Sequence, residues 1–155
     1  MKILLLSDSH YHSISSLDLS QFTHIIHCGD MSEDDQYYLD MNNGIYVNGN
    51  CDRFYSAEKI VNLGGLRCLI THSHAYHTKN GYDGLIARAH TLGVDYVFFG
   101  HTHSRTIFMD DRTTFINPGA FCEGQFAIIE NNTLKFAEED SGLAEGYYIK
   151  KSIFL

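Results

Sequence analysis

Five apolar segments of this sequence each give way, at their carboxyl end, to aspartate, asparagine or histidine. The segments and the residues that follow them are Ile3–Leu6 with Ser7–His10, Ile25–Ile26 with His27–Asp30, Ile45–Val47 with Asn48–Asp52, Cys68–Ile70 with Thr71–His74, and Val97–Phe99 with Gly100–His103. In open α/β sheets the carboxyl ends of the strands meet at one crevice, where ligands bind. Glycine stands directly before Asp30, Asn50 and His101, where it lets the backbone turn sharply and approach a ligand closely. The pattern predicts buried strands that gather polar side chains at one edge.

Carboxylates and imidazoles crowded into a partly buried crevice repel one another or lack partners, and divalent cations relieve that problem. Asp8 and His10 stand two residues apart in an extended segment, so both side chains can point to one side, and His101 and His103 repeat this spacing. Aspartate, asparagine and histidine suit borderline metals such as Mn, Fe, Zn, Ni or Co. Seven or eight such candidates are too many for one tetrahedral ion, but suit two ions roughly 3.5–4 Å apart.

Composition narrows the class of protein. The chain has 155 residues, 44% of them hydrophobic, and its 10 histidines stand beside no tryptophan and a single proline. That length predicts one domain over residues 1–155 with a sizeable core. The formal net charge of -8 argues against a nucleic-acid module with a broad basic face.

The cysteines and the first residues of the sequence indicate in which cellular compartment the protein is expected. Four cysteines are widely spread with no C-x-x-C pair, which argues against a disulfide scaffold and a structural zinc knuckle. The apolar run Ile3–Leu6 is too short for a secretory signal, which needs about 7–15 residues, or for a membrane span of about 20. A soluble, cytoplasmic protein is expected.

The order of elements indicates an α/β chain with late hairpins. Helices are expected from a Ser32 cap through Met41, and from about Tyr82 to Leu92 with Gly93 ending the helix. The expected strands are Lys2–Ser7, Thr23–Cys28, Gly44–Asn48, Lys59–Leu63, Leu66–Thr71, Val94–Phe99, Thr106–Met109, Arg112–Ile116, Phe126–Glu130, Thr133–Ala137 and Tyr147–Phe154. Glu138–Asp140 is expected to be a solvated loop. Strands alternating with helices, then hairpins, predict two packed sheets with helices outside.

The ordered motifs D-x-H at Asp8, G-D at Asp30, G-N-C-D at Asn50, T-H-x-H at His72 and G-H-T-H at His101 resemble the calcineurin-like metallophosphoesterase superfamily. They are most similar to its small bacterial and archaeal phosphodiesterases of the YfcE type. The later segment Asn117–Ala120 also resembles that group, with alanine in place of its usual serine. The likeness runs from Asp8 to about Gly119. It implies a four-layer α-β-β-α sandwich of two mixed sheets flanked by helices, whereas periodicity alone supports only the α/β class.

The resemblance also implies a ligand set and a reaction. One divalent ion would be held by Asp8, His10, Asp30 and His103, and a second by Asp30, Asn50, His72 and His101, with Asp30 as the bridge. The implied mechanism is in-line attack on phosphorus by a hydroxide bridging two metal ions, with manganese the expected metal and Fe, Zn, Ni or Co as alternatives. The expected substrate is a small soluble phosphodiester.

The proton donor departs from the superfamily pattern. Many members have a histidine after the motif asparagine as the proposed donor to the leaving group, and here Cys51 stands there. A thiol is a poor hydrogen-bond donor. His74 is therefore the candidate catalytic acid, with water as the alternative. Asp52 is assigned to the catalytic site as a residue that orients its neighbours, or else as a helix cap.

Other functions compete with this interpretation. Arg53 and Arg105 follow motifs and would suit a substrate phosphate, but a solvated arginine is the simpler expectation for each. The alternatives are a non-catalytic scaffold on the same fold, as in the retromer subunit, and a phosphomonoesterase, which is disfavoured because no arginine closely follows Asp30. A metallo-β-lactamase-like enzyme or amidohydrolase would carry H-x-H early in the chain. The acidic balance argues against long nucleic acids as partners, and no membrane partner is expected.

Overall fold

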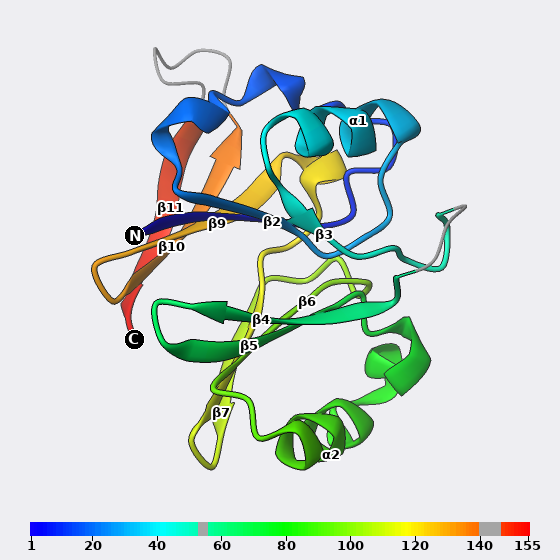
Figure 1. Ribbon diagram of the computed structural model, residues 1–155, viewed down its shortest axis with the longest axis vertical. Coiled ribbons are helices and arrows are strands. Elements are labelled where there is room, and N and C mark those ends of the chain that lie inside the picture. Colours follow the sequence, from blue (N-terminus) through cyan, green and yellow to red (C-terminus); the bar gives the residue numbers. More distant parts are fainter. Residues whose placement is uncertain (53–55, 140–146) are drawn as a thin grey trace.

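The computed structural model describes residues 1–52, 56–139 and 147–155, and contains two mixed β-sheets (Figure 1). The first sheet has the strand order β11-β10-β9-β1-β2-β3. Its strands are β1 (Lys2–Leu6), β2 (His24–His27), β3 (Ile45–Tyr46), β9 (Gln125–Glu130), β10 (Thr133–Glu139) and β11 (Tyr147–Phe154). β1, β2 and β3 run parallel, and β9 joins β1 in the antiparallel direction. The three strands that precede predicted ligands therefore end at the same edge.

The second sheet has the order β4-β5-β6-β8-β7. Its strands are β4 (Glu58–Leu63), β5 (Leu66–Thr71), β6 (Tyr96–Phe99), β7 (Thr106–Asp110) and β8 (Thr113–Asn117). β5, β6 and β8 are parallel, while β4 and β7 pair as antiparallel edges. The carboxyl ends of β5 and β6, like those of β1 and β2, thus carry polar motifs.

Helices α1 (Glu33–Met41) and α2 (Asp83–Leu92) cover the outer faces of the first and second sheet respectively (Figure 1). Ser32 caps α1, because its hydroxyl accepts a hydrogen bond from the Asp35 N–H at 3.1 Å. Gly93 ends α2 with φ +63°, a conformation that favours glycine. The 3₁₀ turns are Ile14–Ser16, Leu19–Gln21, His74–Tyr76, Thr78–Asn80 and Phe121–Glu123.

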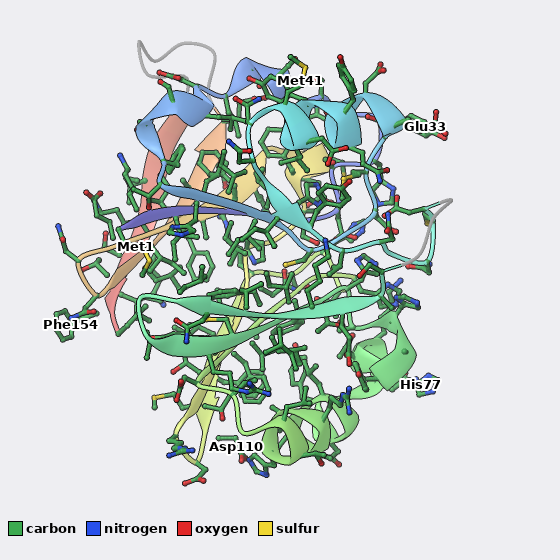
Figure 2. The ribbon with its side chains drawn as sticks, in the orientation of Figure 1. Met1, Glu33, Met41, His77, Asp110 and Phe154 are labelled. Carbon is green, nitrogen blue, oxygen red and sulfur yellow. The ribbon has the colours of Figure 1, made fainter. Side chains whose placement is uncertain are left out.

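Three clusters of apolar side chains hold the sandwich together, and Figure 2 shows side chains filling the space between the sheets and helices. Ile3 and Leu5 of β1 pack between the sheets, whereas Leu4 and Leu6 pack on the side of α1. All four are buried, which explains the continuous apolar run, because both faces of the strand are covered. A third cluster joins the second sheet to α2 through residues such as Leu85.

The predicted four-layer sandwich of two mixed sheets is confirmed, as are both helices and the hairpins. The expected loop at Glu138–Asp140 is wrong for its first two residues, because β10 continues through Glu139 and pairs Glu138 with Gln125 of β9. Asp140 lies outside the described residues. Among the residues that are described, no helix combines the length and apolar character of a membrane crossing. A single domain over residues 1–155 stays a prediction.

Candidate metal centre

The loops that leave β1, β2, β5 and β6 meet at one end of the sandwich. The first two loops are joined by backbone hydrogen bonds, since the Asp8 N–H donates to Gly29 O and the His10 N–H to Asp30 O, both at 2.9 Å. The 3₁₀ turn after β8 joins them, because the Phe121 N–H donates to Ser7 O at 2.8 Å. Backbone contacts between distant segments therefore set the positions of the predicted ligands.

Five predicted ligands bring their polar atoms together in this cluster. Asp8 Oδ1 lies 3.2 Å from His103 Nε2 and 3.8 Å from His72 Nε2. Asp30 Oδ2 lies 3.2 Å from His72 Nε2, and His10 Nε2 lies 3.9 Å from both carboxylates. The Nε2 atoms of His10 and His103 are 3.4 Å apart. The structure therefore brings these five side chains together, and their role as metal ligands stays a prediction.

The hydrogen bonds of His72 leave a lone pair facing the cluster. Its Nδ1 lies 2.9 Å from Cys28 O, and since a carbonyl only accepts, Nδ1 must carry the proton. In the neutral ring Nε2 is then an acceptor facing the Asp30 carboxylate, which is another acceptor. His72 Nε2 and Asp8 Oδ1 are both buried without a hydrogen-bond partner. Such facing acceptors require a proton or a cation between them, and the donor set fits a divalent metal.

The pKa values of Asp30 and His72 also indicate that positive charge is favoured between them. Burial of Asp30 favours its neutral form, but contacts with His72, the Cys51 N–H and His10 together outweigh burial and lower the pKa of Asp30. Burial of His72 likewise favours its neutral form, yet the Asp30 and Asp8 carboxylates raise the pKa of His72. The pocket therefore favours positive charge beside these carboxylates.

The Asp8 carboxylate is held in one orientation. Its Oδ2 accepts a hydrogen bond from the Ser7 hydroxyl at 2.6 Å and another from the His101 N–H at 3.0 Å. Both donors are on the same oxygen, so Oδ1 is left to point at the histidines. A Cβ on Gly100 would lie 2.8 Å from Asp8 Oδ2, so only glycine fits here.

Asp52 joins two loops through its carboxylate. Oδ2 accepts from the backbone N–H groups of Asp30 and Gly49, and Oδ1 accepts from that of Met31, each at 2.8 Å. A Cβ on Gly49 would collide with Asp30 Oδ1, which explains that glycine. These contacts favour the orienting role expected for Asp52 over a helix cap.

The other two histidines predicted to lie in the site, His74 and His101, pack beside His72. The ring of His101 lies 5.1 Å from that of His72 and the ring of His74 lies 5.4 Å from it, measured between centroids. Burial and the nearby His72 lower the pKa of His101 to about 4, and the same two causes lower the pKa of His74. The Nδ1 atom of His74 is buried without a partner. These shifts favour the neutral form of each imidazole, which is the form that binds a cation.

Asn50 differs from the other predicted ligands because its side chain is exposed, with Nδ2 3.8 Å from Cys51 Sγ. Arg53 lies outside the described residues. Arg105 is engaged elsewhere, since its guanidinium donates to Glu138 Oε1 at 3.1 Å and to Ala137 O. The geometry gives no support to Arg105 as a phosphate ligand.

Sequence reasoning missed three residues that shape the site. Ser7 fixes Asp8, as described above. His27 is fully buried, and its Nδ1 accepts from the Gly29 N–H at 3.0 Å, which holds the loop before Asp30. Cys122 lies beside His10 and His103. The D-x-H motif could have flagged Ser7 as its neighbour, but no local pattern marks Cys122.

The fold and the cluster together define a metal-dependent phosphoesterase site. The chain belongs to the calcineurin-like phosphoesterase superfamily, whose domain matches residues 1–137. It is therefore a metal-binding hydrolase of phosphoric esters. A curated relative is the probable metallophosphoesterase YsnB of Bacillus subtilis (strain 168), which is 28% identical over 154 residues that cover 95% of this chain and 90% of that protein.

Solved structures share the fold over nearly the whole chain. A predicted phosphoesterase from Streptococcus pneumoniae TIGR4 has a TM-score of 0.73 at 21% identity, covering 96% of this chain and 97% of that one. An archaeal phosphodiesterase has a TM-score of 0.68 at 23% identity and full coverage of both chains (100% each). Vps29 of Entamoeba histolytica, solved with zinc, has a TM-score of 0.77 at 16% identity, covering 99% and 98%. At these identities the likeness establishes the fold.

Proposed function

We propose that this chain is a dinuclear-metal-dependent phosphodiesterase that hydrolyses a small soluble phosphodiester. The observation that carries the proposal is the pair of buried, unpartnered acceptors Asp8 Oδ1 and His72 Nε2, which face the same group of carboxylates and imidazoles. A structural histidine would bury its nitrogens with partners, as His27 does. Unsatisfied acceptors facing one another are instead typical of a metal site.

The ligand assignment divides the cluster in two. Asp8, His10 and His103 would hold one ion, Asn50, His72 and His101 would hold the other, and Asp30 would contribute to both. Asp30 suits the shared place, because Oδ2 contacts both His10 and His72 while Oδ1 accepts from the Cys51 N–H at 2.9 Å. When bound, two divalent ions, with Mn²⁺ the expected metal, would activate a water for attack and neutralise the phosphoryl oxygens.

The chain's own residues do the rest of the chemistry. His74 stands beside the ligand imidazoles with a partly exposed ring, so its protonated form can pass a proton to the leaving oxygen, and the lowered pKa of His74 makes that form a strong donor. Asp52 orients Asp30 by binding the backbone N–H groups of Asp30 and Met31. Its own carboxylate stays on the backbone and does not reach the reacting atoms.

Two features favour a small, soluble substrate. The net charge of -8 repels long polyanions, which argues against long nucleic acids as substrates. The rim beside Asp30, lined by His10, Tyr11, Ser32 and Cys51, is an open recess of about 200 Å³ that suits a small molecule.

The proposed location is the reducing cytoplasm, and the four cysteines, all unpaired, are in keeping with it.

The experiment is hydrolysis of a chromogenic diester and of its monoester analogue by metal-stripped protein with and without added Mn²⁺. We expect manganese-dependent diester turnover with little monoester turnover, loss of turnover in His72→Ala, and normal turnover in the control His90→Ala, which changes an exposed helix residue. Preferred monoester turnover would reassign the chain as a phosphomonoesterase. Full activity without metal, or a purified protein that binds no metal, would overturn the proposal, and the second result would favour a non-catalytic scaffold.

A further inference from the structure

Cys122 lies on a 3₁₀ turn that is fastened to the end of β1. Its N–H donates to Asp8 O at 3.0 Å, and the preceding Phe121 N–H donates to Ser7 O at 2.8 Å. The Phe121 side chain is fully buried in the core beneath the turn. The backbone that carries the Cys122 thiol is therefore fixed against the Asp8 loop.

The thiol belongs to the same cluster as two imidazoles. Cys122 Sγ and ligand nitrogens of His10 and His103 all lie within 4.8 Å of one another. The Asp8 carboxylate offers a further metal-binding atom beside these imidazoles. Its Oδ1 lies 3.2 Å from His103 Nε2 and is buried without a hydrogen-bond partner. Two imidazole nitrogens and a sulfur therefore lie close together, and the unpartnered Asp8 oxygen lies beside one of the same imidazoles.

We propose that Cys122 supplies a thiolate ligand to the ion held by Asp8, His10 and His103. This inference rests on the metal centre of the proposed function, but not on the reaction it catalyses. Binding breaks the S–H bond, forms a metal–sulfur bond and releases the proton to solvent, while the metal keeps its charge of two. No oxidant or reductant takes part.

A thiolate would make the two metal positions chemically different. Together with the Asp8 carboxylate and the shared Asp30 carboxylate, two imidazoles and one thiolate form a donor set that suits Zn²⁺, Co²⁺ or Fe²⁺, whereas oxygen-rich sites suit Mn²⁺ and Mg²⁺. The position around His72, Asn50 and His101 has no cysteine in the groups that the described residues form there. A softer ion is therefore expected beside Cys122 even where manganese fills the other position.

Cys51 is the competing thiol, and it fits less well. Its sulfur shares a group with His10 and Asp30, but the side chain is exposed, and only one imidazole accompanies it. Cys28 and Cys68 are buried in the apolar core between the sheets. Cys51 and Cys122 are thus the two thiols that an experiment must separate.

The test is titration of the metal-stripped full chain with Co²⁺ under anaerobic, reducing-agent-free conditions. A cobalt–thiolate bond gives an intense near-ultraviolet charge-transfer band that nitrogen and oxygen ligands do not give. We expect the band in the wild type and in Cys51→Ser, and its loss in Cys122→Ser, which should also release one proton fewer on binding. Circular dichroism of each variant checks folding.

Several results would overturn the inference. Cobalt that binds the wild type without the band removes Cys122 as a ligand while leaving the metal centre intact. A band that persists in Cys122→Ser, or disappears in Cys51→Ser, assigns the sulfur to Cys51. If Cys122→Ser does not fold, zinc-edge X-ray absorption of Cys51→Ser decides, because Cys122 must then give a Zn–S distance of about 2.3 Å. A band together with absent diester hydrolysis would reject the proposed reaction and keep the ligand.

Discussion

Changing Asp8 to asparagine should abolish the stabilisation that comes from the ion at the Asp8 position, while leaving the metal-free fold intact. The Ser7 hydroxyl and the His101 N–H both donate to Oδ2, so the asparagine carbonyl oxygen must take that place. The amide NH₂ then occupies the position of Oδ1, 3.2 Å from His103 Nε2. There it can donate to the imidazole, but it cannot bind a metal. Asp8→Asn thus replaces a ligand with a donor at nearly constant shape.

The expected size follows from the contacts. Asp8→Ala would leave two donors in a buried site without their acceptor, at about 1–3 kcal/mol each, whereas Asp8→Asn keeps both bonds. Without metal, the free energy of unfolding of Asp8→Asn should stay within about 1 kcal/mol of the wild-type value, because a buried charge is also removed. In wild type, free metal at about 100 times Kd adds about 2.7 kcal/mol per site. For a chain of 155 residues this raises Tm by roughly 5–11 °C per site.

The assay is thermal unfolding with chelator and with a series of metal concentrations. The matched control is Asp111→Asn, which changes an exposed residue of the β7–β8 turn with φ +54°, a conformation asparagine tolerates. The control should keep the full metal shift. A shift in Asp8→Asn equal to that of wild type would refute the role of Oδ1 as a ligand. A metal-free variant less stable by about 3 kcal/mol or more would refute the account of its hydrogen bonds.

Four further outcomes are expected. His74→Asn should lower kcat by about 10²–10⁴ with metal content unchanged, so an unaltered kcat would remove His74 as the acid. Asp52→Asn turns an amide NH₂ toward backbone donors, which should weaken metal binding about 10–100-fold in calorimetric titration. Gly49→Ala forces a Cβ onto Asp30 Oδ1 and should cost about 1–3 kcal/mol in urea unfolding. Burial, with help from His72, lowers the pKa of His27 to about 3, so only the unfolded chain gains a proton there as pH falls from about 6.5 toward 3. Metal-free stability should therefore drop between pH 7 and pH 5, and drop less in His27→Asn.

The parts of the fold that follow from local chemistry were predictable from sequence. A serine cap at Ser32 and a left-handed glycine at Gly93 each depend on a few neighbouring residues. The length of β10 was not predictable in that way. Glu138 and Glu139 have the composition of a loop, but pairing with β9 and β11 on both sides extends the strand through them. Tertiary pairing thus overrides local preference there.

In the site too, some residues could be predicted from local sequence and others are placed only by tertiary contacts. The five loops were identified because each carries a recognisable ligand type after an apolar strand, and Asp8, His10, Asp30, His72 and His103 do converge. Cys122 was assigned no role because its place beside His10 arises from a turn that packs across from the far end of the chain. A contact of this kind leaves no spacing or periodicity in the sequence.

The backbone conformations of the ligand loops make the five motifs depend on one another. Five of the predicted ligands have positive φ, namely Asp8 (51°), His10 (49°), Asp30 (61°), His101 (74°) and His103 (59°). Each such conformation costs roughly 1–3 kcal/mol unless its surroundings enforce it. The enforcing contacts come from other motifs: Asp52 binds the Asp30 N–H, the His10 N–H binds Asp30 O, and the Asp8 carboxylate binds the His101 N–H. Each loop is therefore stable only when its neighbours are in place, so a substitution in one loop should displace ligands carried by the others.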